Sequence, residues 1–151
     1  MKAILFDNYG DSSAMYCGEI EKPEINEDEV LIKVAAAGIN RPDILQRQGS
    51  YPPPAGASKI LGLEVSGKII KIGKNISLDF LNKEVCALVT GGGYAEYVKT
   101  TVSTVLTLPK GVNIIEAAAI PETFFTVWTN LFDSGSLKKN ETLLIHGGAS
   151  G

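Results

Sequence analysis

Cysteine and histidine are scarce in this chain, whose 151 residues include only Cys17, Cys86 and His146. A structural zinc site uses four Cys or His ligands, and a catalytic site about three protein ligands. Three such residues, far apart and without paired spacing, predict that the chain has no Cys/His zinc site. They also give no sign of a disulfide framework, although a single bridge between the two cysteines stays open.

Long apolar runs and clusters of one charge are missing as well. The apolar run that follows Lys2 ends at Asp7, too early for a signal peptide or a membrane-spanning helix. The net charge is −3 and no run of five like charges occurs, whereas nucleic-acid binding requires clustered Lys and Arg. We therefore expect a soluble protein, cytoplasmic by default, with neither nucleic acid nor a membrane as its partner.

Short strand patterns and frequent glycines fill most of the chain. Strands are predicted at residues 2–6, 18–21, 29–37, 84–90, 94–99 and 102–108, with a strand pair or one bent strand at 60–72. Asn40 caps a short helix with Pro42 in its first turn, and the three prolines of residues 52–54 require an extended loop. The pattern predicts a mainly β fold with short helices, either a barrel or a sandwich.

The character of the sequence changes after Pro109. Residues 113–120 are predicted to form a short helix capped by Asn113, and residues 122–132 carry apolar side chains at helical spacing. Residues 142–146 form an apolar run typical of a strand buried on both faces of a parallel sheet. A chain that stops just beyond such a strand indicates the first half of a longer protein.

Glycines follow this predicted strand directly. A glycine-rich turn after a strand begins many dinucleotide-binding folds, because backbone N–H groups there approach the pyrophosphate and the next helix offers its positive N-terminus. Gly148 and Gly151 supply two of the expected glycines. From these residues alone, an ordinary turn is an equally open interpretation.

Several segments, taken in order, carry a family resemblance. The runs AAAGINRPDILQRQGSYPPP, ILGLEVSGKI, GGGYAEYV, AAAIPETFFTVW and ETLLIHGGASG resemble the medium-chain dehydrogenase/reductase superfamily across the whole chain. The sequence is most similar to the zeta-crystallin-like NADPH:quinone oxidoreductases, especially their tumour-suppressor-inducible branch. The resemblance implies a GroES-like, partly open β-barrel at residues 1–120, followed at 121–151 by the first helix and strand of a truncated Rossmann domain.

Departures from the zinc-dependent alcohol dehydrogenases in this superfamily narrow the implied chemistry. Those enzymes carry a ligand cysteine where this chain has Asn40 and a ligand histidine where it has Leu63, and their four-cysteine loop is replaced by the turn at residues 91–93. The resemblance therefore implies zinc-independent hydride transfer from NADPH to an electrophilic acceptor such as a quinone or an activated alkene. We expect the whole protein to be a homo-oligomeric oxidoreductase.

The resemblance also assigns roles to individual residues. Asn40 would hydrogen-bond the nicotinamide side or the acceptor oxygen, and its amide can do so while its backbone opens the helix. Tyr51 would line the acceptor pocket, unless it only packs its loop against the barrel. Thr126 would contact the nicotinamide, or else bond its own helix carbonyl. Glu64, in an apolar strand, must be paired or hydrogen-bonded, and we expect a structural role.

Two other functions stay open. An enoyl or 2-alkenal reductase of the same superfamily would use the same residues, and a stand-alone GroES-like binding module would need no catalysis. We expect this 151-residue chain alone to be inactive and to bind NADPH weakly or not at all. Its last ~30 residues are expected to be disordered, swapped or sheltered in an oligomer, because the predicted strand lacks its sheet.

Overall fold

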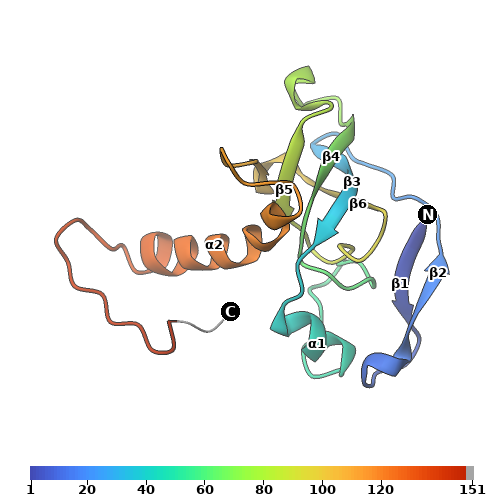
Figure 1. Ribbon diagram of the computed structural model, residues 1–151, viewed down its shortest axis with the longest axis horizontal. Helices are drawn as coiled ribbons and strands as arrows, with labels where there is room; N and C mark the ends of the chain where they lie inside the picture. Colours follow the sequence, from blue (N-terminus) through green and yellow to red (C-terminus); the bar gives the residue numbers. More distant parts are fainter. Residues whose placement is uncertain (149–151) are drawn as a thin grey trace.

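The computed structural model describes residues 1–148 and contains two antiparallel sheets (Figure 1). The smaller sheet pairs β1 (Lys2–Phe6) with β2 (Met15–Glu19). The larger sheet has the strand order β6-β3-β4-β5-β7. Its strands are β3 (Glu29–Ala37), β4 (Glu64–Ile72), β5 (Glu84–Leu88), β6 (Tyr97–Thr101) and β7 (Val105–Thr107).

The two sheets are joined next to β6. The Ile4 N–H donates to the Tyr94 carbonyl at 2.8 Å, and the Glu96 N–H donates to the Lys2 carbonyl at 3.0 Å. These bonds surround a bridge between Ala3 and Ala95. The result is a partly open barrel, which confirms the predicted mainly β fold with short helices.

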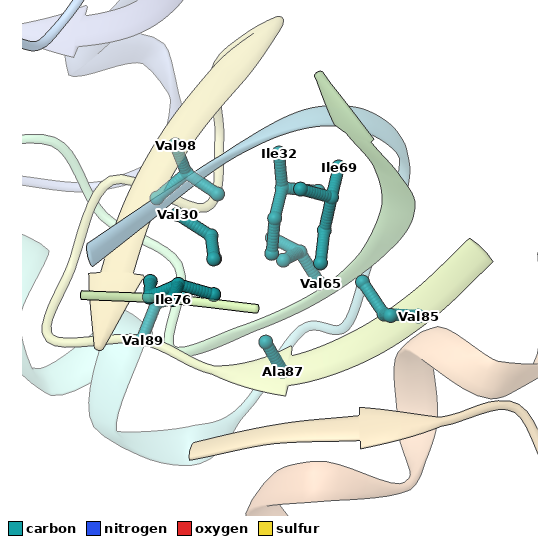
Figure 2. Packing of buried hydrophobic residues seen from close by; sticks show 9 residues of the cluster. All are labelled: Val30, Ile32, Val65, Ile69, Ile76, Val85, Ala87, Val89 and Val98. Carbon is teal, nitrogen blue, oxygen red and sulfur yellow. The ribbon is translucent and has the colours of Figure 1, made fainter. Parts of the chain in front are cut away.

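β-branched side chains fill the barrel. Ile32, Ile69, Val65 and Val85 are fully buried, and Figure 2 shows them with their neighbours directed into the space between the strands. Such residues suit strand interiors, because their stiff side chains pack well on a pleated surface. Burying each side chain contributes about 1.5–3 kcal/mol, so this cluster is the main stabilising feature of the barrel.

Short helices lie at the ends of the barrel. α1 (Arg41–Arg47) follows β3 with Asn40 at its N-cap, and its bounds confirm the predicted helix. α2 (Pro121–Trp128) extends away from the barrel and continues as a π-helical turn, Thr129–Ser134, in place of the regular helix predicted through residue 132 (Figure 1). The remaining helical segments are 3-10 turns: Ser12–Ala14, Leu78–Phe80, Val102–Thr104 and Glu116–Ala119.

Asn113 caps the last of these turns. Its side-chain oxygen accepts hydrogen bonds from the backbone N–H groups of Ile115 and Glu116, both at 2.9 Å. The predicted capping role of Asn113 is therefore confirmed. The segment that follows is a single 3-10 turn, Glu116–Ala119, where a short helix over residues 113–120 was predicted.

Several predicted strands have different bounds. β2 begins at Met15, three residues before the predicted start, and β6 begins at Tyr97. The chain from Tyr94 to Glu96 bonds to β1, although the Glu96 carbonyl also accepts from the Val34 N–H of β3 at 2.9 Å. Residues 60–63 form a loop rather than the start of β4, because they bond to the glycine turn. The Gly92 N–H donates to the Ile60 carbonyl at 2.7 Å, and the Tyr94 N–H to the Leu61 carbonyl at 3.0 Å.

The strand predicted at residues 142–146 is not formed. These residues are irregular and exposed, and the side chain of Leu144 is 79% accessible. A parallel strand needs backbone hydrogen bonds to neighbouring strands, and none of the strands of residues 1–148 lies beside this segment. Within that range no helix has the length and apolar content needed to cross a membrane.

Candidate functional site

The turn from β3 into α1 holds Asn40 through both its backbone and its side chain. The Asn40 backbone N–H donates to Asp43 Oδ2 at 2.9 Å, and its side-chain Nδ2 donates to Glu64 Oε1 at 2.8 Å. The backbone thus opens the helix while the amide is directed toward the barrel. Both roles considered for Asn40 are sterically compatible, since they use separate groups.

Asp43 connects three segments of the chain. Its side chain is only 2% exposed, and besides Asn40 it accepts hydrogen bonds from the Gly62 N–H at 3.0 Å and the Tyr94 hydroxyl at 2.9 Å. Burial and the negative charge of Asp43 raise the pKa of Tyr94, so its phenol stays protonated and donates. Asp43 therefore joins α1, the loop before β4 and the segment after the glycine turn.

Glu64 connects the Asn40 turn to α2. This β4 side chain is 2% exposed, and its second oxygen, Oε2, accepts a hydrogen bond from the Glu122 backbone N–H at 2.9 Å. Gly38 leaves the space that the carboxylate occupies, because a Cβ at this glycine would lie 2.1 Å from Glu64 Oε1. The prediction that Glu64 is hydrogen-bonded is confirmed.

A small cavity opens beside this network, and we call it the Tyr51 cavity. Its volume is ≈ 210 Å³. Its wall contains polar side chains from α1, the proline loop and α2, together with apolar side chains from the loop before β4 and from β5. It is lined by Gln46, Tyr51, Pro53, Pro54, Ala57, Ser58, Leu63, Leu88, Val89, Thr90, Gly91 and Glu122.

Two polar groups in this wall have unusual surroundings. Gln46 is 7% exposed, and its side-chain amide makes no hydrogen bond within residues 1–148 but is not enclosed, since the fully buried side-chain atom without a partner in that range is Ser66 Oγ. Burial, followed by the nearby charges of Glu64 and Asp43, raises the pKa of Glu122 above the usual value of a glutamate. An amide that makes no hydrogen bond within the described residues and a carboxyl group whose pKa is raised are both able to bind a polar ligand group.

The residues singled out from sequence fall into three places. Asn40 and Tyr51 belong to neighbouring parts of one region, because Glu64 joins Asn40 to Glu122 and Glu122 shares the cavity with Tyr51. Thr126 lies on the exposed face of α2, one turn beyond Glu122. Gly148 lies in a turn at the end of the described segment, apart from that cavity, and Gly151 is outside the described residues.

The alternative considered for Thr126 does not hold for this residue. Within residues 1–148, the threonine of α2 that bonds back to its own helix is Thr123, whose hydroxyl donates to the carbonyls of Ile120 and Ala119. The Thr126 hydroxyl makes no such bond there, and its carbonyl accepts from the Asn130 amide at 2.7 Å. Thr126 therefore presents a hydroxyl to its surroundings.

Sequence reasoning did not identify Asp43, Gln46 or Glu122 as members of this region. Asp43 carried a signal, since it stands three residues after the cap Asn40, where a carboxylate can bond back to the cap backbone. Gln46 and Glu122 carried none, because their shared cavity depends on the packing of α1 and α2 around β5. Over residues 1–148, no three Cys, His, Asp or Glu side chains are grouped as metal ligands.

Comparison with known proteins shows the family of this architecture. The alcohol dehydrogenase GroES-like domain family matches residues 26–110, more than half of the chain. The chain therefore belongs to this family, which forms the N-terminal domain of medium-chain dehydrogenase/reductases.

Two individual relatives are 30% and 33% identical to this chain. A quinone oxidoreductase of Lama guanicoe is 33% identical over 100% of this chain and 46% of its own length. The mouse synaptic vesicle membrane protein VAT-1 homolog-like is 30% identical over 100% of this chain and 36% of its own length. The chain thus spans less than half the length of these curated relatives.

Solved structures give the same result. The Escherichia coli quinone oxidoreductase, crystallised with NADPH, superimposes with a TM-score of 0.75 and 26% identity, covering 89% of this chain and 41% of that one. The CurK enoyl reductase superimposes with a TM-score of 0.77 and 27% identity, covering 87% and 42%. Quinone and enoyl reductases are therefore equally distant relatives.

Proposed function

We propose that residues 1–120 form the substrate-side domain of a zinc-independent, NADPH-dependent quinone oxidoreductase, and that residues 121–151 begin its dinucleotide-binding domain. The zeta-crystallin-like enzymes, including the tumour-suppressor-inducible branch, are the proposed subgroup. The observation that carries this proposal is the Tyr51 cavity, which Glu122 and Glu64 connect to Asn40.

The cavity has the character of a site for a small, flat carbonyl compound. Its ≈ 210 Å³ is below the roughly 300–1,000 Å³ typical of drug-sized ligands. Leu63, Leu88 and Val89 provide apolar wall, while Gln46, Tyr51 and Glu122 can hydrogen-bond an oxygen. A quinone combines these two properties, because its ring is apolar and its carbonyl oxygens accept hydrogen bonds.

The described residues suit only the nicotinamide end of a dinucleotide. Within residues 1–148 the Thr126 hydroxyl makes no hydrogen bond and could bind a carboxamide, whereas residues 142–146 do not form the strand that a pyrophosphate site requires. When bound, a reduced nicotinamide supplies a hydride. The part of this chain is to bind and orient the acceptor and to exclude water.

Two alternatives are supported by separate observations. The likeness to the CurK enoyl reductase favours a reductase of unsaturated carbonyl compounds, whose carbonyl oxygen would occupy the same polar wall. The partly open barrel of residues 1–120 is compatible with a stand-alone binding module, since its core cluster contains no residue of α2. Turnover by the protein expressed from its complete gene separates these functions.

The test compares NADPH oxidation with 1,2-naphthoquinone and with trans-2-hexenal. Faster turnover of the quinone supports the proposal, and faster turnover of the alkenal supports the enoyl reductase. A protein that oxidises NADPH with neither acceptor would contradict both and favour the binding module. Tyr51→Phe tests the site itself: we expect a higher KM for the quinone, with Tyr97→Phe on β6 as the matched control.

A further inference from the structure

The carboxyl group of Glu122 has a setting that the proposed function has not yet used. Glu122 lines the Tyr51 cavity at the second position of α2, and its backbone N–H is fixed to Glu64 Oε2 at 2.9 Å. The backbone of Glu122 is therefore held by one buried carboxylate, at the edge of the space where an acceptor would bind.

We propose that Glu122 is the residue that donates a proton to the carbonyl oxygen of the acceptor in the Tyr51 cavity. This inference rests on the proposed function and adds the proton source to it. Tyr51 and Gln46 would bind the same acceptor by hydrogen bonds, and Leu63 and Leu88 would contact its ring.

The groups that surround Glu122 favour this role. Burial is the largest influence on the pKa of Glu122 and raises it. The negative charges of Glu64 on β4 and Asp43 on α1 raise this pKa further. The titratable group buried on β5 is Cys86, whose thiol pKa burial raises, and Glu116 on the turn before α2 is exposed. Glu122 thus retains its proton to a higher pH than an ordinary glutamate.

The other titratable group in the cavity wall is Tyr51, and its position is less suited to proton donation. Its side chain is half-exposed in the proline loop, and a phenol is in general a weaker acid than a carboxyl group. A general acid works best when its pKa lies near the operating pH. A carboxyl group whose pKa is raised is closer to that condition than a phenol.

The proposed step balances as follows. The acceptor carbon takes a hydride, and thereby two electrons, from a reduced nicotinamide dinucleotide, so that its carbonyl oxygen gains negative charge. The O–H bond of Glu122 breaks and a new O–H bond forms on that oxygen. The oxidised nicotinamide and the Glu122 carboxylate remain, and solvent reprotonates Glu122 through the open mouth of the cavity. For a quinone, hydride addition at a ring carbon and this proton give a keto tautomer of the hydroquinone. The ring carbon then loses a proton to solvent, and the second carbonyl oxygen gains one, which gives the hydroquinone.

Binding of duroquinone to this chain tests the proposal without any turnover. Every ring carbon of this quinone that could add a thiol carries a methyl group, so the exposed Cys17 does not add to it readily. The dissociation constant is measured by NMR from about pH 4, near the ordinary glutamate pKa of about 4.3, to about pH 9. We expect it to rise about tenfold as Glu122 loses its proton, because a hydrogen-bond donor is replaced by a negative charge that repels the carbonyl oxygen.

Glu122→Gln keeps a hydrogen-bond donor and the backbone bond to Glu64 but cannot titrate. We expect this variant to bind duroquinone with a dissociation constant independent of pH, while the control Glu116→Gln behaves as the wild type. In the protein expressed from its complete gene, Glu122→Gln should lower kcat about a hundredfold with KM nearly unchanged.

The outcomes separate this inference from the proposed function. If duroquinone binds in the cavity but the pH dependence survives in Glu122→Gln, Glu122 is not the donor and the quinone site stands. If kcat is unchanged in Glu122→Gln, the inference is likewise overturned. If the wild type binds duroquinone at no pH, the acceptor site itself is wrong, and both proposals fail together.

Discussion

Replacing Tyr94 by phenylalanine removes one hydrogen bond from the Asp43 network and leaves its packing intact. The Tyr94 hydroxyl donates to Asp43 Oδ2 at 2.9 Å, and Asp43 is 2% exposed, so water replaces the lost donor only poorly. A hydrogen bond to a charged group contributes about 1.5–3 kcal/mol. We therefore expect Tyr94→Phe to lower the free energy of unfolding by about 2 kcal/mol.

Urea denaturation at neutral pH measures this loss. With a slope of about 2 kcal/mol/M for a chain of this size, the midpoint should fall by roughly 1 M while the slope stays constant. Tyr97→Phe is the matched control. In the described part of the chain its hydroxyl makes no hydrogen bond, and its ring contact with Lys22 is retained by phenylalanine. We expect a change below about 0.5 kcal/mol for the control.

A double-mutant cycle distinguishes the bond from general packing. In an Asp43→Ala background the Tyr94 hydroxyl has lost its acceptor, so Tyr94→Phe should change stability little, which gives a coupling of about 1–2 kcal/mol. Equal effects of Tyr94→Phe in the two backgrounds, or equal effects of Tyr94→Phe and Tyr97→Phe, would refute the role assigned to Asp43.

Three further substitutions test other parts of the structure. Gly38→Ala places a Cβ 2.1 Å from Glu64 Oε1 and should destabilise the chain by about 1–3 kcal/mol in urea denaturation. The control Gly10→Ala, whose nearest contact would be at 3.4 Å, should change the free energy of unfolding little. Equal effects of the two substitutions would argue against the close approach of Glu64 to Gly38. Ile32→Ala removes a fully buried core side chain, and we expect the free energy of unfolding to fall by about 2–5 kcal/mol. A fall below about 1 kcal/mol would show that this core is loosely packed. Because the folded-state pKa of Glu122 is raised, its contribution to stability is complete below the unfolded pKa and is lost as the pH rises through the folded pKa. The stability of the wild type relative to Glu122→Gln should therefore decline with rising pH above about 4.3, and a difference independent of pH would contradict the assignment.

The fold was largely predictable because its signals are local. β3 has the bounds expected from its strand pattern, and α1 begins at the cap and proline that the sequence contains. The strand predicted at residues 142–146 depends on long-range partners instead. Its apolar run is compatible with a buried strand, but only adjacent strands can satisfy its backbone groups. Apolar composition alone therefore cannot predict whether such a segment forms.

The site was predictable only in part, for the same reason. Asn40 and Tyr51 were identified through the family resemblance, and Glu64 through the difficulty of burying a carboxylate without partners. Gln46 stands in a helix and Glu122 at the start of another, and neither has a local feature that distinguishes it from a surface residue. Their place in one cavity wall follows from how α1 and α2 meet the same sheet, which one sequence does not reveal.

The two oxygens of Glu64 have a consequence for motion. One holds the amide of Asn40 in the turn after β3, and the other holds the Glu122 N–H at the start of α2. A rigid carboxylate group cannot follow both partners if they separate, so a tilt of α2 away from the barrel must lengthen one of these bonds. Through Glu64, a change in the position of α2 would therefore change the orientation of the Asn40 amide.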